Sequence, residues 1–325
     1  MKIGIYGYGN IGKGVECACR QNKDIELIGI FTRRDKSTVK PIFDTKVYSA
    51  SEVKDFKDKI DVLVVCGGSA TELPTMTVDL AKDFNVIDTF DTHANILEHF
   101  NNVDKVAKES NHIAMISCGW DPGMFSLNRL YASAILPEGK DYTFWGRGVS
   151  QGHSDAIRRI EGVVDAKQYT VPIDAAVAKV KNGEMPELSV REKHKRECYV
   201  VVADGADKEK IEKEIKTMPH YFDEYETEVN FISMEEFRKD HMGMPHAGFV
   251  SRTGFTGKDK EHKHTVTYSL SLDSNPEFTA SVVVAFARAL CKEKARGTTG
   301  CLTTLDIRPR DLVTEDYNEL LKHMM

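Results

Sequence analysis

The N-terminal third of the chain alternates short apolar runs with longer segments whose apolar residues recur every three or four positions. The short runs predict strands and the longer segments predict helices, because their periods match these two geometries. The predicted strands are Lys2–Tyr6, Ile25–Phe31, Asp61–Cys66, Val86–Thr89 and Ile113–Ser117, and the predicted helices are Ile11–Asn22, Ala70–Asn85 and His93–Asn111. Strands that alternate with helices predict an α/β domain with a doubly wound, Rossmann-type parallel sheet.

Beyond Trp120 the predicted strands alternate apolar with polar residues, as Thr265–Leu270 does. A sheet that is covered on one face gives this alternation, so we expect an α+β domain with a mixed or antiparallel sheet. Its predicted strands are Asp141–Gly146, Lys167–Val171, Lys195–Ala203, Glu226–Ile232 and His264–Leu272, with a helix at Asp207–Thr217 and a charged loop at Gly254–His262.

A long helix is predicted at Phe278–Arg296, where apolar residues form a stripe typical of a core-facing helix. We expect this helix to return to the first domain. The 325 residues fit two domains at about 150 residues each. The predicted division is therefore residues 1–119 together with 277–325, and residues 120–276.

Composition limits the partners and the compartment. The formal net charge of −6 argues against nucleic acid or an anionic membrane as the main partner. The most apolar stretches, Val62–Cys66 and Ser281–Cys291, are shorter than the ~18 residues that a membrane span needs. Seven scattered cysteines without a Cys-x-x-Cys pair argue against disulfides and a zinc site, and the histidines suggest no metal. We expect a soluble cytoplasmic protein.

A glycine motif follows the first predicted strand and opens the first helix. Its sequence is Gly7-Tyr8-Gly9-Asn10-Ile11-Gly12, a G-x-G-x-x-G. In this context the glycines permit a tight turn and let a pyrophosphate approach the helix N-terminus, which predicts dinucleotide binding. The alternative is that these are ordinary turn glycines.

The end of the second strand indicates which dinucleotide binds. An NAD site usually carries an acidic residue there for the ribose 2′-hydroxyl, whereas this strand runs into Thr32-Arg33-Arg34. Guanidinium groups suit a 2′-phosphate, so we expect NADP(H). Alternatively, both arginines are surface charges and Asp35 pairs with one of them.

Another small-residue loop, Cys66-Gly67-Gly68-Ser69, follows the buried third strand. Loops at this position face the ligand in doubly wound sheets, so we expect it to lie against the cofactor. Helix capping by Ser69 is the alternative, and both can hold.

Polar residues gather where loops are predicted. Asp91 and Asp121 follow the ends of two strands and could hold an ammonium group, or alternatively cap helices. Thr170, Arg196 and His246 in the second domain are a candidate carboxylate clamp. Taken singly, such residues are more often surface or capping groups. A thioester-forming role for Cys118 is disfavoured, because no base is evident beside it.

Seven segments in order along the chain resemble the meso-diaminopimelate dehydrogenase family. They are Gly-Tyr-Gly-Asn-Ile-Gly, Phe-Thr-Arg-Arg, Gly-Trp-Asp-Pro-Gly-Met-Phe-Ser, Phe-Trp-Gly, Ser-Gln-Gly-His-Ser-Asp-Ala, Gly-Met-Pro-His and Asn-Pro-Glu-Phe-Thr-Ala. The resemblance extends from the first residues to about residue 290, and the third and fifth segments are far more specific than the glycine loop. The charged stretch Lys258–Lys263 departs from it by being longer and more basic than expected.

This resemblance implies an NADP-dependent amino-acid dehydrogenase. Its reaction would be reversible oxidative deamination of the D-centre of meso-2,6-diaminopimelate, giving L-2-amino-6-oxopimelate and ammonia for lysine and cell-wall precursor synthesis. It also implies a homodimer, with residues 1–119 and 277–325 binding the dinucleotide and residues 120–276 binding substrate and forming the dimer. The alternatives are a related dehydrogenase of another D-amino acid and a non-catalytic NADPH-binding sensor.

The resemblance also implies roles for individual residues. Asp91, Asp121 and Trp145 would surround the reacting D-centre, and the proton acceptor would be one of the two aspartates, with His153 and water as alternatives. Gln151, Gly152 and Asp155 would line the substrate pocket, while Thr170, Arg196 and His246 would bind the distal L-centre and Asn275 would complete the site. The cofactor would contact Gly7, Tyr8, Gly9, Asn10, Ile11, Gly12, Thr32, Arg33, Arg34, Cys66, Gly67, Gly68, Ser69, Thr89, Phe90, Asp91, Cys118, Gly119, Trp120, Asp121 and Pro122.

Overall fold

A computed structural model describes residues 1–219 and 221–325 of the chain. These residues form two compact units. Unit 1 comprises Met1–Leu127 and Pro276–Met325, and unit 2 comprises Asn128–Asn275.

Unit 1 contains a seven-stranded sheet in the order β14-β6-β5-β4-β1-β2-β3, and every strand pair in it is parallel. The strands are β1 (Lys2–Tyr6), β2 (Glu26–Thr32), β3 (Val47–Ser49), β4 (Val62–Val65), β5 (Val86–Asp88), β6 (Ile113–Met115) and β14 (Gly300–Leu302). The five predicted strands and the parallel sheet are confirmed. The edge strands β3 and β14 were not predicted, because their sequences, Val-Tyr-Ser and Gly-Cys-Leu, lack the run of β-branched apolar residues that marks a strand such as β4.

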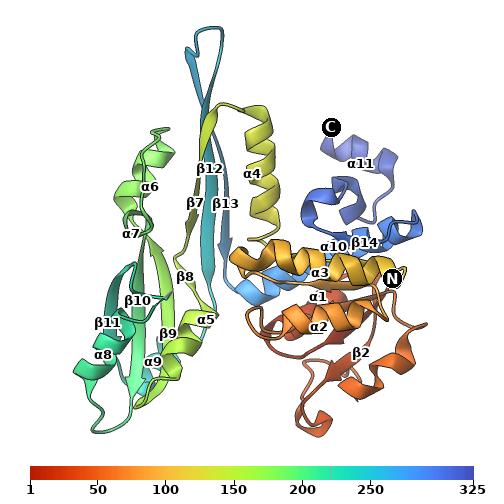
Figure 1. Ribbon diagram of the computed structural model, residues 1–325, viewed down its shortest axis with the longest axis horizontal. Coiled ribbons are helices and arrows are strands. Elements are labelled where there is room, and N and C mark those ends of the chain that lie inside the picture. The colour runs from red at the N-terminus through yellow and green to blue at the C-terminus, as the bar shows by residue number, and fades with distance from the viewer. Residues whose placement is uncertain (220) are drawn as a thin grey trace. The chain divides into compact units, whose positions relative to one another are not determined.

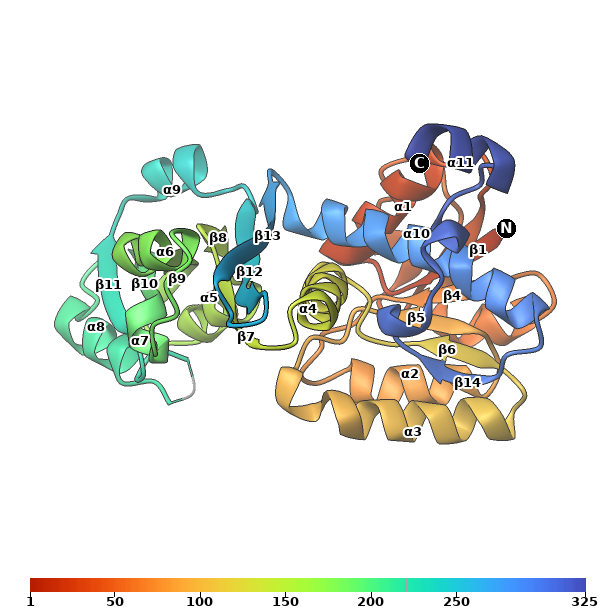
Figure 2. The ribbon, with the colours of Figure 1, turned by 90° about the horizontal axis from the view of Figure 1, so that it is seen from above.

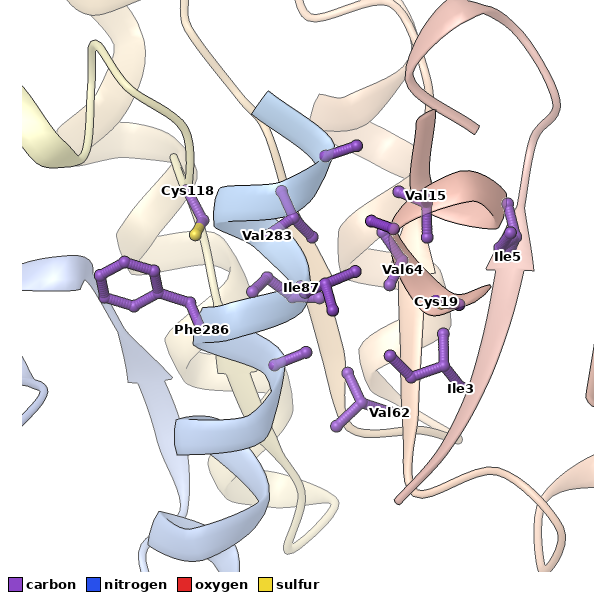
Figure 3. Packing of buried hydrophobic residues seen from close by; sticks show 14 of the residues in the cluster. Ile3, Ile5, Val15, Cys19, Val62, Val64, Ile87, Cys118, Val283 and Phe286 are labelled. Atoms are coloured by element: carbon purple, nitrogen blue, oxygen red, sulfur yellow. The ribbon is translucent and has the colours of Figure 1, made fainter. Parts of the chain in front are cut away.

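Helices cover both faces of this sheet. Figure 2 shows α2 (Leu73–Ala81) and α3 (Ile96–Glu109) on one side, and α1 (Asn10–Gln21) and α10 (Asn275–Ala295) on the other. Side chains of β4 alternate between the two layers. Val62 and Val64 pack with Val15, Val283 and Phe286 (Figure 3), whereas Leu63 and Val65 belong to the cluster on the opposite face.

The predicted helix Ala70–Asn85 is longer than the one observed. In the structure α2 spans Leu73–Ala81. Pro74 lies in its first turn, where the missing proline N–H has no helical acceptor to lose. Residues 66–72 consequently remain a loop at the carboxyl end of β4.

Unit 2 contains a four-stranded sheet, β11-β10-β9-β8, and a three-stranded antiparallel sheet, β13-β12-β7. The first is mixed, because β10 and β11 run parallel and the other pairs run antiparallel. The strands are β7 (Gly139–Trp145), β8 (Gly148–Val149), β9 (Val163–Pro172), β10 (His194–Val202), β11 (Glu226–Phe231), β12 (His246–Thr256) and β13 (His262–Leu272). The predicted α+β class is confirmed.

The helices of unit 2 are short. They are α5 (Gln151–Arg158), α6 (Asp174–Lys181), α7 (Val190–Lys193), α8 (Lys208–Lys216) and α9 (Met234–Asp240). Ile157 of α5 and Ile211 of α8 pack on the four-stranded sheet, and Val180 of α6 packs on the three-stranded one. Two further helices are α4 (Met124–Ile135), which begins in unit 1 and continues into unit 2 from Asn128, and α11 (Tyr317–Met324), near the C-terminus.

The charged loop predicted at Gly254–His262 is wrong at both ends. Strand β12 continues to Thr256 and β13 begins at His262, so the two form the long hairpin visible in Figure 1. The pairing of β12 with β7 ends at Gly254, and its pairing with β13 extends it to Thr256. Only residues 257–261 form the turn. Among the described residues, no helix has the length and apolar character needed to cross a membrane.

Candidate active site

The loop after β1 has the geometry of a phosphate-binding turn. Gly7 has φ +97°, and a Cβ atom there would lie 2.2 Å from the carbonyl oxygen of Cys66. A Cβ atom at Gly12 would lie 2.4 Å from the carbonyl oxygen of Gly7, whereas one at Gly9 would meet nothing within 4 Å. Gly9 is the N-cap of α1 and supplies no side-chain cap. The first N–H groups of α1, which include Asn10 and Ile11, therefore suit a pyrophosphate.

The side chain of Tyr8 supports this loop from within. It is buried, and its hydroxyl donates to the buried carboxylate of Glu16. Glu16 also accepts from the backbone N–H groups of Ile42 (3.0 Å) and Phe43 (3.3 Å). Burial raises the pKa of Tyr8, and the Glu16 hydrogen bond raises it further. Its side chain thus joins the glycine loop to the segment after β2.

The predicted 2′-phosphate residues lie beside the same loop. Arg34 donates through Nη2 to the carbonyl oxygen of Tyr8 (2.7 Å), and its backbone N–H donates to Oγ1 of Thr32 (3.2 Å). Arg33 forms an ion pair with Glu72. The alternative that Asp35 pairs with one of these arginines is wrong: Asp35 accepts from the N–H (2.9 Å) and hydroxyl (2.8 Å) of Ser37.

Glu72 links Arg33 to the second small-residue loop. Its Oε1 pairs with Arg33, and its Oε2 accepts from the backbone N–H of Gly68 (2.7 Å). Both contacts lower the pKa of Glu72, the Gly68 hydrogen bond more than Arg33. The guanidinium of Arg33 and the Cys66–Ser69 loop are therefore held together on one side of unit 1.

Ser69 joins the loop after β4 to the loop after β5. Its Oγ accepts from the N–H groups of Asp91 (2.8 Å) and Thr92 (3.1 Å). The alternative that Ser69 caps α2 is wrong, since the N-cap of that helix is Glu72. Asp91 is exposed, and the N-cap of the following short helix is Thr92, so Asp91 does not cap it either.

The loop after β6 is tightly closed. Met124 N–H donates to the carbonyl oxygen of Gly119 (3.0 Å), and Phe125 N–H donates to that of Trp120 (2.8 Å). Asp121 and Pro122 lie between them and are partly buried. Cys118 is fully buried and its burial raises its pKa well above the usual thiol value, which does not suit a nucleophile.

Asp88 is a residue of this region that the sequence analysis missed. It ends β5 and is fully buried, and its carboxylate forms four hydrogen bonds. The available signal was an acidic residue ending an otherwise apolar strand, next to the loop that carries Thr89, Phe90 and Asp91.

In unit 2, Arg196 is the central polar residue. It lies on β10, is 7% exposed, and donates to Oγ1 of Thr170 on the neighbouring strand. Its guanidinium carbon lies 3.8 Å from the ring centroid of Tyr225, and its buried Nε atom has no hydrogen-bond partner in the described part of the chain. Among the described residues no carboxylate pairs with Arg196. Burial lowers its pKa.

His246 reaches this position because of a glycine. Gly148 on β8 pairs with Thr170 on β9, and Thr170 pairs with Arg196 on β10. The three therefore lie in one row across the sheet, called the Arg196 row below. A Cβ atom at Gly148 would lie 2.3 Å from the imidazole of His246. The ring therefore occupies the space that a side chain would fill, and the structure brings Thr170, Arg196 and His246 together.

Two histidines near Arg196, the half-buried His153 and the buried His194, add no positive charge. Burial, with a contribution from Arg196, lowers the pKa of both His153 and His194 to about 3. His194 accepts the backbone N–H of Trp145 at Nε2 (2.9 Å), which requires that nitrogen to be unprotonated. Trp145 also stacks on the His194 ring. The predicted Trp145 is thus adjacent to the Arg196 row.

The remaining predicted residues of unit 2 lie on α5 and at the start of α10. Gln151 and Gly152 begin α5, and Nε2 of Gln151 lies 2.6 Å from Sδ of Met244. Asp155 forms an ion pair with Arg158. Asn275 begins α10, and its N–H donates to the carbonyl oxygen of Met244 (2.9 Å).

Two more polar residues share the face of Arg196 and were not predicted. Thr227 pairs with Arg196 on β11, and Gln168 lies two residues before Thr170 on β9. Both are buried, and within residues 1–219 and 221–325 the Thr227 hydroxyl and both amide atoms of Gln168 lack a hydrogen-bond partner. The paired strands are far apart in the sequence, so only the strand register shows that Thr227 and Gln168 lie on the face of Arg196. Within the described part of the chain, no three His, Cys, Asp or Glu side chains are grouped to hold a metal.

Comparisons with known proteins identify relatives of this chain. The family described as "Diaminopimelic acid dehydrogenase C-terminal domain" matches residues 119–274. A meso-diaminopimelate D-dehydrogenase from Acetivibrio thermocellus is 57% identical, covering 100% of this chain and 98% of the relative. The structure of DAP dehydrogenase from C. glutamicum in complex with DAP is 44% identical with a TM-score of 0.93, covering 100% of this chain and 99% of its own. An engineered D-amino acid dehydrogenase bound to NADP+ is 42% identical with a TM-score of 0.89, at the same coverage.

Proposed function

The chain belongs to the family of meso-diaminopimelate D-dehydrogenases, and we propose that it catalyses the NADP-dependent, reversible oxidative deamination of meso-2,6-diaminopimelate at its D-centre. The products are L-2-amino-6-oxopimelate and ammonia. Four relatives of this name are 45% to 57% identical over 94% to 100% of this chain, which supports the proposal. We place the reaction in the cytoplasm, in lysine and cell-wall precursor synthesis.

The buried Arg196 is the observation that carries the choice of substrate. A guanidinium at 7% exposure with no carboxylate partner among the described residues is costly unless a ligand supplies the negative charge. Thr170 and His246 add hydrogen-bonding groups beside it. A substrate with a second carboxylate, distant from the reacting carbon, meets this requirement, whereas an amino acid with an apolar side chain does not.

We assign the NADP(H) site to unit 1. The pyrophosphate would lie at the N-terminus of α1 beside Gly9, and the 2′-phosphate would bind Arg33 and Arg34. The loops Cys66–Ser69, Thr89–Asp91 and Cys118–Pro122 would hold the rest of the cofactor. When bound, NADP+ supplies the hydride acceptor.

The protein's own residues would then bind, orient and deprotonate. Asp91 and Asp121 would hold the D-centre ammonium, and Thr170, Arg196 and His246 would hold the distal carboxylate. Loss of hydride from the D-carbon and a proton from nitrogen leaves an imine, and water then adds to its carbon and releases ammonia. We assign proton acceptance to the two aspartates. His153, with a pKa near 3 and a hydrogen bond between Nδ1 and the Ser150 hydroxyl, is a poor base at neutral pH.

The proposed stereochemistry has a direct test. Purified protein should reduce NADP+ with meso-diaminopimelate and scarcely react with the L,L isomer, because anchoring one L-centre leaves the other centre with the wrong hand. Absorbance at the NADPH band, over a panel of D-, L- and meso-diamino acids, measures this. Comparable rates with the two isomers would refute the stereochemical argument. NADPH binding without oxidation of any amino acid tested would favour the sensor.

We further propose a homodimer formed through unit 2. The exposed large apolar side chains of α4 are Leu130, Tyr131 and Ile135, with exposures of 46%, 47% and 67%. Val266 of β13 is also exposed, and a pocket lined by both α4 and β13 residues shows that these elements are neighbours. Several exposed large apolar side chains on one helix and its neighbouring strand support an interface at this face.

The double variant Tyr131→Glu/Ile135→Glu should therefore convert the dimer to a monomer, since it places two carboxylates in an apolar contact. Light scattering after size-exclusion chromatography at several protein concentrations measures the mass. The matched control is Leu97→Glu, at an exposed apolar position on α3 of unit 1, which should leave the mass unchanged. A wild-type chain that is monomeric throughout contradicts the homodimer.

A further inference from the structure

We propose that Asp88 is a positioning residue, which uses one carboxylate oxygen to set the backbone of the two loops that carry Asp91 and Asp121. The inference rests on the proposed function, because those aspartates matter only if they act on the substrate. Asp88 ends β5 and is fully buried. It therefore acts on the loops through hydrogen bonds to their backbone, and its own side chain is not exposed to solvent.

The two oxygens of Asp88 serve different partners. Oδ1 accepts from the backbone N–H groups of Phe90 (3.0 Å) and Ser117 (3.0 Å), one in each loop. Oδ2 accepts from the hydroxyl of Thr77 on α2 (2.7 Å) and bonds to Nε2 of His99 on α3 (2.8 Å). Oδ1 therefore binds both loops, and Oδ2 fixes the carboxylate to α2 and α3.

The loop after β6 depends on this contact for its unusual backbone. Ser117 has φ 55°, a left-handed conformation that non-glycine residues rarely adopt. Its N–H donates to Asp88 Oδ1, and the next N–H, of Cys118, donates to the Asp88 backbone oxygen (2.9 Å). Two consecutive peptide groups at the turn that leads to Asp121 are thus bound to one residue.

The loop after β5 is held from two sides. Phe90 N–H binds Asp88, and its ring stacks on His99 with centroids 4.2 Å apart. The next N–H, of Asp91, binds the Ser69 hydroxyl. The backbone that presents Asp91 is therefore enclosed between Asp88 and Ser69, and a small displacement of Asp88 would move it.

The asymmetry between the two oxygens makes the role testable. In Asp88→Asn the amide oxygen can still accept from both loop N–H groups, while the amide nitrogen can donate to the Thr77 hydroxyl and to a neutral His99. In Asp88→Ala both loop N–H groups lose their acceptor. In Thr77→Val only the helix side loses a hydrogen bond, so this near-isosteric variant is the matched control.

We expect Asp88→Ala to lower kcat for meso-diaminopimelate by about 10-fold to 100-fold, the cost of a displacement of about 1 Å at reacting groups. Asp88→Asn and Thr77→Val should stay within about 3-fold of wild type, even where Thr77→Val lowers the melting temperature. If Asp88→Ala does not fold, Asp88→Ser replaces it, because a hydroxyl is too short to reach both loops. Unchanged kcat in the folded Ala or Ser variant overturns the proposal, as does an equal loss in Thr77→Val or Asp88→Asn.

Hydrogen–deuterium exchange gives a readout that does not depend on the substrate. Peptides covering residues 89–92 and 117–121 should exchange faster together in Asp88→Ala and remain protected in Thr77→Val. Acceleration of only one loop overturns the proposal that a single oxygen sets both. A wild-type enzyme that is inactive with meso-diaminopimelate would instead refute the proposed function, whatever the exchange pattern.

Discussion

Replacing Arg196 with leucine should raise the KM for meso-diaminopimelate by about 100-fold or more, since loss of one partner of a buried charge pair costs roughly 2–5 kcal/mol. Arg196 is buried, donates to Thr170, and has no carboxylate partner among the described residues. The substrate's distal carboxylate would be its counter-ion. Initial rates of NADP+ reduction over a range of substrate concentrations measure the change.

Stability distinguishes a binding role from a structural one. Desolvating a guanidinium without a counter-ion is unfavourable, so Arg196→Leu should leave the melting temperature unchanged or raise it. The matched control is Lys195→Leu, the adjacent position on the other face of β10, where the side chain pairs with Glu197 (3.1 Å) and Glu228 (3.3 Å). This control should leave the KM unchanged. A melting temperature that falls steeply in Arg196→Leu while the KM is constant would make Arg196 a structural residue.

Substrates provide a second comparison. D-lysine has an amino group but no carboxylate at its distal end, so it cannot use the Arg196 charge. Any activity with it should be affected much less by Arg196→Leu than activity with meso-diaminopimelate. Equal losses with both substrates would contradict the assignment of Arg196 to the distal carboxylate.

Local sequence patterns predicted unit 1 well because its strands, turns and candidate cofactor loops follow one another directly along the chain. The strand Lys2–Tyr6, the glycine turn and the following helix are consecutive, and each loop that faces the cofactor in the proposal directly follows a strand. The parallel sheet follows from the alternation of strands and helices. The edge strand β14, which joins the sheet from residue 300 onward, has no local signal that identifies its neighbour.

The Arg196 row was predicted less completely because strand register creates it. Thr170, Arg196 and Thr227 come from three strands, and Gly148 comes from a two-residue strand within a glycine-rich segment. The sequence analysis named Thr170, Arg196 and His246 together, but the structural reason that His246 joins the other two is the missing side chain of Gly148. Asp88 was missed for a similar reason: its four partners come from two helices and two loops.

Cofactor preference provides the second large effect. The double variant Arg33→Ala/Arg34→Ala should raise the KM for NADP+ by about 100-fold and leave the KM for NAD+ within about 3-fold of its wild-type value, since hydrogen bonds to charged groups contribute roughly 1.5–3 kcal/mol each. Only NADP+ carries the 2′-phosphate that the two guanidinium groups would bind. Initial rates with each cofactor, at saturating meso-diaminopimelate, give both constants.

A substitution of Glu72 tests the role of Arg33 in a second way. Because Arg33 pairs with Glu72, a 2′-phosphate must compete with that carboxylate, and Glu72→Gln should lower the KM for NADP+ by about 2-fold to 5-fold, the worth of an exposed ion pair. The control Lys36→Ala removes a nearby exposed cation that pairs with Glu52 and should change neither constant. Equal effects of the double arginine variant on NADP+ and NAD+ would mean that Arg33 and Arg34 support the loop, through contacts such as that of Arg34 with the Tyr8 carbonyl, and do not select the cofactor.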